Sequence, residues 1–144
     1  MHPRNRWFIV CSLAYAVLGG VFGVLQTVAP GLVPGLPARA HAHIMLLGFV
    51  TMMIYGVGLH VLPRFANRPL HWERLANAQF WMANAGLILI VAGWLVYWKP
   101  LLVVGGALAW AAMVAFAYNI IRSVSAKPPA ADAQTSEPPT AGED

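Results

Sequence analysis

Long apolar runs, separated by short polar or proline-rich breaks, make up most of this chain. Four runs contain no Asp, Glu, Lys or Arg, and they cover residues 7–29, 40–62, 75–98 and 101–121. A helix needs about 20 apolar residues to cross the hydrocarbon core of a bilayer. The pattern therefore predicts an all-α protein, an integral membrane four-helix bundle, with residues 1–124 as one transmembrane domain.

The breaks between the runs predict where the helices end. Residues 30–37 read Pro-Gly-Leu-Val-Pro-Gly-Leu-Pro, and residues 63–69 begin and end with proline. Proline has no N–H group and clashes with the preceding helical turn, so both stretches interrupt a helix. We expect Asn67 to cap a helix that starts near Pro69 and runs along the interface before it enters the membrane. Lys99-Pro100 is expected to form a tight turn between antiparallel neighbours.

Residues 125–144 differ in composition from the rest of the chain. They are rich in Pro, Ala, Ser, Thr and acidic residues, with no aromatic residue and no periodicity. Such a segment cannot bury enough apolar surface to offset the entropy lost on ordering. We predict a disordered cytoplasmic tail that is dispensable for folding.

Composition and charge narrow the class of protein. Hydrophobic residues make up 59% of the chain and charged residues 10%, against about 25% charged in soluble domains. The basic residues stand singly between apolar runs, which argues against nucleic acid as a partner. We expect the lipid bilayer as the main environment.

The distribution of Lys and Arg predicts the orientation. With the N-terminus inside, the inner side holds seven basic residues, and the outer side holds only Arg39 and Lys99. Positively charged loops stay in the cytoplasm. Both termini are therefore expected to be cytoplasmic.

Three histidines lie in the second apolar run, where ionisable side chains are costly and mark functional sites. His41 and His60 are 19 residues apart, about 28 Å along a helix, so they cannot share a metal ion. His41 and His43 diverge by about 200° around a helix axis. The face below His41 carries small residues and methionines, whereas the face below His43 is aliphatic. We therefore expect His41 to face inward as the main candidate metal ligand, with His43 as a possible candidate and His60 as a weak one.

Other readings of these residues stay open. Glycines on the His41 face, including Gly48 and Gly56, would either leave room for the edge of a flat ligand or pack against the Gly19–Gly23 pair of the first run. His60 would form a structural hydrogen bond to Asn84 or to a carbonyl. Gln26 and Thr27 are expected at the depth of His41, Asn77 and Asn84 to join helices, and His2 and His71 to be solvated.

The second run resembles the second helix of haem-copper oxidase subunit I. Residues 38–49 read Ala-Arg-Ala-His-Ala-His-Ile-Met-Leu-Leu-Gly-Phe, and residues 55–64 read Tyr-Gly-Val-Gly-Leu-His-Val-Leu-Pro-Arg. The resemblance is closest to cbb-type oxidases and nitric oxide reductases, and it extends to the NnrS family. In the oxidases, a histidine at the outer start of this helix is an axial ligand of haem b. The resemblance places His41 or His43 at that position, and Phe49 favours His41.

The resemblance implies a haem b-binding membrane protein of the bacterial inner membrane, active in electron transfer or in haem or nitric oxide handling. Residues 75–121 contain no histidine, so we do not expect a complete oxidase or reductase in this chain. It would work as a homo-oligomer or within a larger respiratory membrane complex. The alternatives are a non-catalytic structural subunit or assembly factor, and a copper-binding protein that uses His41, His43 and nearby methionines.

Overall fold

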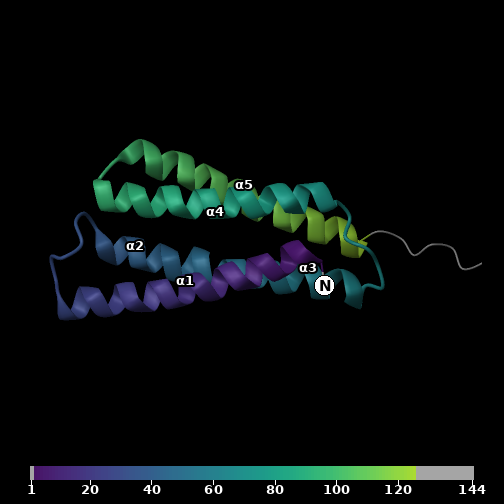
Figure 1. The fold of residues 1–144 in the computed structure, drawn as a ribbon. Helices are drawn as coiled ribbons and strands as arrows, with labels where there is room; N and C mark the ends of the chain where they lie inside the picture. Colours follow the sequence, from purple (N-terminus) through teal and green to yellow (C-terminus); the bar gives the residue numbers. More distant parts are fainter. Residues whose placement is uncertain (1, 126–144) are drawn as a thin grey trace, which may run out of the picture.

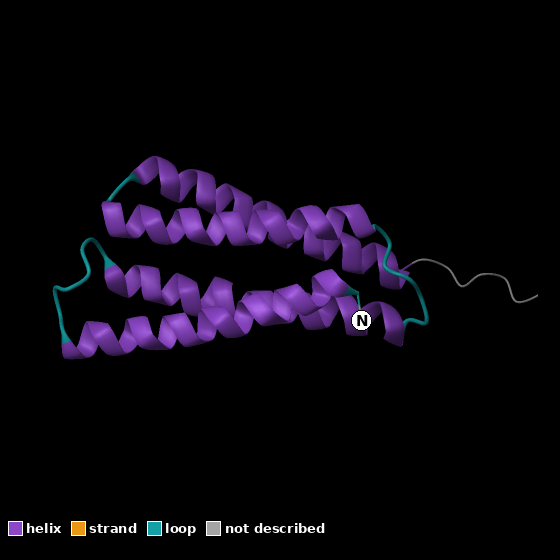
Figure 2. Ribbon diagram, in the orientation of Figure 1, coloured by secondary structure: helices purple, strands orange, loops and turns teal. Residues whose placement is uncertain are grey.

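The computed structural model describes residues 2–125, and these form helices joined by short loops, with no strand among them (Figure 2). The elements are α1 (Pro3–Val28), α2 (Pro37–His43), the π-helix η1 (Ile44–Thr51), α3 (Met52–Phe65), α4 (Glu73–Val96) and α5 (Lys99–Ser125). Because α2, η1 and α3 continue into one another, the described chain contains four helices that are long and apolar enough to cross a membrane. The predicted all-α, four-span architecture is confirmed.

The helices pack as two hairpins, one made of α1 with α2–η1–α3 and the other of α4 with α5 (Figure 1). Both described ends of the chain lie at one end of the bundle. We call this end the arginine end, because Arg4, Arg64, Arg68 and Arg122 lie in the helix ends and the loop there. The other end, which holds His41 and His43, is the histidine end. Which end faces the cytoplasm stays a prediction.

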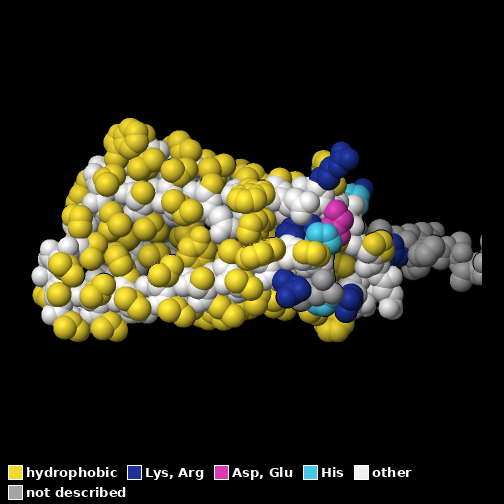
Figure 3. Space-filling model, in the orientation of Figure 1, with side chains coloured by type: hydrophobic (Ala, Val, Ile, Leu, Met, Phe, Trp, Pro, Cys, Tyr) yellow, Lys and Arg dark blue, Asp and Glu magenta, His cyan; other side chains and the backbone are white. Residues whose placement is uncertain are grey.

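Large apolar side chains cover the outside of the bundle, as expected for helices in contact with lipid. Figure 3 shows hydrophobic side chains over most of the visible face and charged ones gathered at the arginine end. The buried core is small, and its largest members include Phe8, Met52 and Leu87. Phe8 packs edge-to-face against Tyr55 of α3 and Phe80 of α4, so it connects α1 to its own hairpin partner and to the other hairpin.

Local hydrogen bonds explain where α1 begins and where α3 ends. The His2 imidazole accepts a hydrogen bond from the N–H of Arg4 at 3.3 Å, so His2 caps α1 and is more than a solvated side chain. Asn67 is left-handed, with a φ of 52°, and follows the end of α3. The N–H groups of Asn67 and Arg68 donate back to the carbonyls of Arg64 and Pro63 at 2.9 Å each, which is the Schellman pattern of a helix C-terminus.

Two predicted boundaries are therefore wrong. Asn67 does not begin a helix, because its left-handed backbone closes α3, and α4 starts later, at Glu73. Lys99-Pro100 is not the turn between the last two helices. The chain turns at Tyr97 and Trp98, and Lys99 and Pro100 are the first residues of α5. Proline is tolerated in the first helical turn, where its missing N–H would have no partner.

Candidate functional site

The His41 imidazole packs against α1. Its Nδ1 lies 3.0 Å from the carbonyl oxygen of Gly19. A methyl group added to Gly23 would come within 2.9 Å of the His41 Cε1 atom. The two glycines therefore let the ring lie directly against the backbone of α1, on the inward face that the sequence predicted for His41.

The contact with Gly19 fixes which nitrogen of His41 is free. A carbonyl oxygen only accepts hydrogen bonds, so the Nδ1 atom facing it must carry the proton in the neutral ring. The Nε2 atom then holds a lone pair, and within residues 2–125 it takes part in no hydrogen bond. A neutral imidazole with Nδ1–H held by a backbone carbonyl is the usual form of a metal-ligating histidine.

His43 points to the other hairpin. Its Nδ1 lies 2.8 Å from the carbonyl oxygen of Arg39, and its ring centre is 6.0 Å from that of Trp94 on α4. The Arg39 guanidinium lies over the same indole, 4.8 Å from the ring centre. The Trp94 N–H is buried without a partner in the described structure. The expected divergence is observed, because His41 contacts α1 whereas His43 faces α4.

His60 lies far from these residues, toward the arginine end of α3. The expected hydrogen bond between His60 and Asn84 is not present. Asn84 instead accepts from the Tyr15 hydroxyl at 3.0 Å and donates to the Phe80 carbonyl at 2.8 Å. The two side chains lie at different depths. Asn84 is 11 residues from the start of α4, whereas His60 is only 5 residues from the end of α3. The difference corresponds to an offset of about 9 Å along the helices.

Large side chains occupy the space beside the glycines below His41. A methyl group on Gly48 would come within 2.9 Å of the Tyr15 side chain, and one on Gly56 within 2.8 Å of Ile9. Gly48 and Gly56 therefore accept large side chains from α1, and Gly48 also accepts Leu87 from α4 at 2.9 Å; neither glycine meets the glycines of α1. The space that we expected there for the edge of a flat ligand is occupied by Tyr15 and Ile9.

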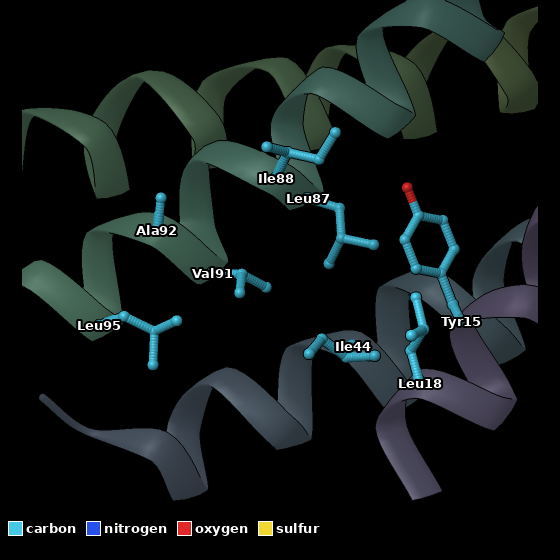
Figure 4. Close-up of a pocket in the computed structure, with 8 residues that line it drawn as sticks. All are labelled: Tyr15, Leu18, Ile44, Leu87, Ile88, Val91, Ala92 and Leu95. Carbon is cyan, nitrogen blue, oxygen red and sulfur yellow. The ribbon is translucent and has the colours of Figure 1, made fainter. Parts of the chain in front are cut away.

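An open groove lies instead between the two hairpins, on the side of η1 that faces α4 (Figure 4). Its volume is about 320 Å³, and we call it the apolar groove. Its lining residues come from α1, η1 and α4: Tyr15, Leu18, Ile44, Leu87, Ile88, Val91, Ala92 and Leu95. Ile44 directly follows His43, and Leu95 directly follows Trp94. The groove therefore reaches the histidine end and offers an almost wholly hydrophobic surface.

Gln26 and Thr27 do not complete a site around His41. The Gln26 amide donates to the Phe22 carbonyl, and the Thr27 hydroxyl donates to the Gly23 carbonyl, both within α1. Among the described residues, no group of three or more His, Cys, Asp or Glu side chains lies close enough together to hold a metal ion. Within residues 2–125, a metal at the histidine end would thus find single imidazoles and no complete ligand cluster.

Arg4 forms the largest polar network of the structure, at the arginine end. The Arg4 side chain is 5% exposed, and its guanidinium donates to the carboxylate of Glu73 at 2.6 Å and to the amide oxygen of Asn77 at 3.0 Å. It also donates to the side chain of Asn5. The network joins the parallel starts of α1 and α4. Sequence reasoning missed Arg4, although Glu73 as the only acid before residue 125 was a signal that it needs a partner.

Asn119 forms a second polar junction at the same end. Its fully buried side chain accepts from the Trp72 N–H and donates to the Trp72 carbonyl, at 2.9 Å each. One turn later, the Ser123 hydroxyl accepts from the N–H of His71 at 2.8 Å. These bonds hold the loop before α4 against the last turns of α5. Asn77 and Asn84 both bond to side chains of α1, which confirms their expected role in joining helices.

Comparison with known proteins gives a distant similarity to a bacterial oxidase subunit. No protein-family model and no solved structure matches the chain. Part of the chain is similar to the cbb3-type cytochrome c oxidase subunit CcoN1 of Stutzerimonas stutzeri, with 28% identity over 121 aligned residues. The match covers 62% of this chain and 26% of that subunit, so it spans about a quarter of the relative.

The comparison and the fold together define a coarse class. The chain is a multi-pass helical protein suited to a membrane, and it is distantly similar to a bacterial oxidase subunit. The similarity agrees with the resemblance of residues 38–64 to the second helix of haem-copper oxidase subunit I.

Proposed function

We propose that this chain is a haem b-binding protein of the bacterial inner membrane that uses His41 as an axial ligand of the iron. The observation that carries the proposal is the state of the His41 ring. Its Nδ1 faces the Gly19 carbonyl at 3.0 Å, which leaves the Nε2 lone pair of this half-buried ring without a partner among the described residues. The similarity to an oxidase subunit supports the same ligand chemistry.

The donor set fits a haem better than a bare metal ion. Haem iron receives four nitrogens from its own macrocycle and needs only one or two ligands from the protein. Copper or zinc would need several converging protein ligands, and residues 2–125 contain no such group. A bound haem would supply one-electron redox chemistry or a site for a diatomic gas.

The protein residues would do three things for such a group. His41 would hold the iron, and Gly19 would fix the tautomer and the orientation of the ring. Arg39, held over Trp94 at 4.8 Å, would place a positive charge beside the carboxylates that a haem carries.

One described chain supplies a single well-oriented ligand. His43 faces Trp94, and His60 lies toward the opposite end of the bundle, so neither joins His41 on one iron. A second ligand would come from a second copy of the chain or from another subunit of a respiratory complex. Without it, the iron would keep an open position for nitric oxide.

The test is an absorption spectrum and a pyridine haemochrome assay on the full chain, purified in mild detergent from a haem-sufficient host. We expect a Soret band, a sharp reduced α-band and one haem for one or two chains. His41→Ala should contain no haem, while His60→Ala, the matched control in the same membrane span, should keep it. His43→Ala should keep haem with an altered spectrum.

Rescue separates ligation from folding. A His41→Gly variant leaves space beside Gly23, so added imidazole should restore haem binding if the ring acts only as a ligand. Full haem retention in His41→Ala would refute the assignment. A colourless protein with stoichiometric copper would instead identify a copper-binding protein, and one without metal would identify a structural subunit or assembly factor.

A further inference from the structure

A second pocket, at the arginine end, has a chemistry unlike that of the histidine end. It has a volume of about 210 Å³ and is lined by Arg68, Pro69, Leu70, His71, Arg122 and Ser123. We call it the basic pocket. Arg68 belongs to the loop between α3 and α4, and Arg122 to the last turn of α5. No acidic side chain lines the pocket.

The pocket is held open by buried hydrogen bonds. The His71 N–H donates to the Ser123 hydroxyl at 2.8 Å, and this hydroxyl donates to the Asn119 carbonyl at 2.7 Å. Asn119 in turn holds both backbone groups of Trp72. Asn119 is 0% exposed and Ser123 3%. The loop that carries Arg68 is therefore fixed beside Arg122 by groups that neither arginine supplies.

The charges of the pocket are not balanced within the described structure. The ion pair found among residues 2–125 joins Arg4 to Glu73, so Arg68 and Arg122 have no acidic partner there. Two guanidinium groups around one small pocket repel each other unless an anion lies between them. Guanidinium groups bind phosphate oxygens in bidentate fashion, which makes a phosphate group the best-matched anion.

The surroundings of the pocket favour a lipid as the source of that phosphate. The pocket lies where α5 leaves its apolar span, and the neighbouring side chains Ile121 and Val124 are 58% and 43% exposed. Tyr118, one turn before Arg122, lies edge-on to His71 with ring centres 6.0 Å apart. The basic pocket matches a phosphate headgroup, and the exposed apolar face of α5 matches the acyl chains. The aromatic ring of Tyr118 is typical of the membrane interface between them.

We infer that the basic pocket binds the phosphate headgroup of an anionic phospholipid, with the acyl chains along the exposed face of α5. This inference is independent of haem binding, since the pocket and His41 lie at opposite ends of the bundle. The predicted orientation puts the pocket in the cytoplasmic leaflet, whose anionic lipids attract juxtamembrane arginines.

Native mass spectrometry of the detergent-solubilised full chain tests the inference, with phosphatidylglycerol and phosphatidylcholine titrated separately. We expect a clear preference for phosphatidylglycerol, and a loss of about tenfold or more in its binding for the double variant Arg68→Gln/Arg122→Gln. The matched control is Arg6→Gln/Arg64→Gln, which removes the same charge from exposed positions at the same end. The control should keep the preference. Thermal melting checks that each variant is folded.

Three results would overturn the inference. Equal loss in both double variants would show diffuse attraction to the positive end. Displacement of phosphatidylglycerol by inorganic phosphate at equal concentration would show a site for free phosphate. A preference that emerges only after truncation behind Ser125 would show that residues 126–144 occupy the pocket. If the double variant does not fold, Arg122→Gln alone, at an exposed position, should still weaken phosphatidylglycerol binding about fivefold.

Discussion

The two ends of the bundle handle their polar side chains in opposite ways. At the arginine end, Arg4, Glu73 and Asn77 bond to one another, and Asn119 holds both backbone groups of Trp72. At the histidine end, His41 and His43 each use Nδ1 for a backbone carbonyl and leave Nε2 without a partner in the described structure. Satisfied groups stabilise the fold, whereas a nitrogen lone pair on a half-buried ring without a partner is available to a ligand. The comparison assigns a stabilising role to the buried polar networks of the arginine end and a ligand-binding role to the imidazoles of the histidine end.

The first prediction concerns which end of the bundle faces the cytoplasm, and its outcome is all-or-none. The bias of Lys and Arg predicts that the arginine end is cytoplasmic. Reporter fusions after Ala126 should read as cytoplasmic, and an insertion in the loop of residues 34–37 should read as external. Opposite readings would place the candidate haem site on the cytoplasmic side.

Removal of Arg4 should produce the largest loss of stability. Arg4→Ala leaves the amide oxygen of Asn77 and the charge of Glu73 without their partner, and we expect a loss of about 3 kcal/mol in the free energy of unfolding. Glu73 is 52% exposed, which keeps the effect at the lower end for a buried pair. Denaturation in mixed micelles measures it. The neighbouring exposed Arg6→Ala should change stability by less than about 0.5 kcal/mol, and similar losses in both variants would contradict the structural role of Arg4.

Removal of Asn119 should have a smaller effect of the same kind. Asn119→Ala leaves the N–H and the carbonyl of Trp72 without their partner, at a cost of about 1–2 kcal/mol. Gln26→Ala serves as the comparison from the histidine end, because Gln26 bonds only within its own helix. Its effect on the free energy of unfolding should be close to zero. A larger loss in Gln26→Ala would reverse the division of roles between the two ends.

A pair of glycine substitutions should give the smallest effect and test the position of His41. A methyl group at Gly23 would press on the His41 ring at 2.9 Å, whereas one at Gly20 meets nothing within 4 Å. Gly23→Ala should therefore weaken haem binding about fivefold, since overpacking costs about 1 kcal/mol. Gly20→Ala should leave haem binding unchanged and stabilise α1 slightly. Haem titration of both variants tests this, and equal affinities would show that the ring does not depend on Gly23.

Sequence reasoning could predict the fold because its signals are periodic and long. Four uncharged runs of membrane-spanning length are read directly from hydropathy, and the inward face of His41 follows from the small residues and methionines that helical spacing places below it. Helix ends were harder to predict. Asn67 suits both a helix N-terminus and a left-handed C-terminus, and only the backbone shows that it closes α3. The π-helical stretch Ile44–Thr51 has no sequence signature comparable to proline or glycine.

The contacts of the candidate site depend on how the hairpins pack, which no single helix pattern contains. Spacing separated His41 from His43 but gave no partner for either ring, and it paired His60 with Asn84 at the wrong depth. The Gly19 carbonyl and the Trp94 indole lie on other helices, so their proximity is a tertiary fact. The role of Arg4 could not be predicted for the same reason, because its partners Glu73 and Asn77 lie on a helix that starts 69 residues later.

Because Arg4 and Glu73 are far apart along the chain, they are synthesised at different times. Synthesis proceeds from the N-terminus, so α1 reaches the bilayer with its guanidinium group uncompensated and in need of water or headgroups. Glu73 emerges only after α3 has been made, and the pair closes when α4 enters beside α1. The ion pair therefore forms late during synthesis. It joins α1 to α4 once the third span is in place, before α5 completes the second hairpin, and a chain arrested earlier would lack this link.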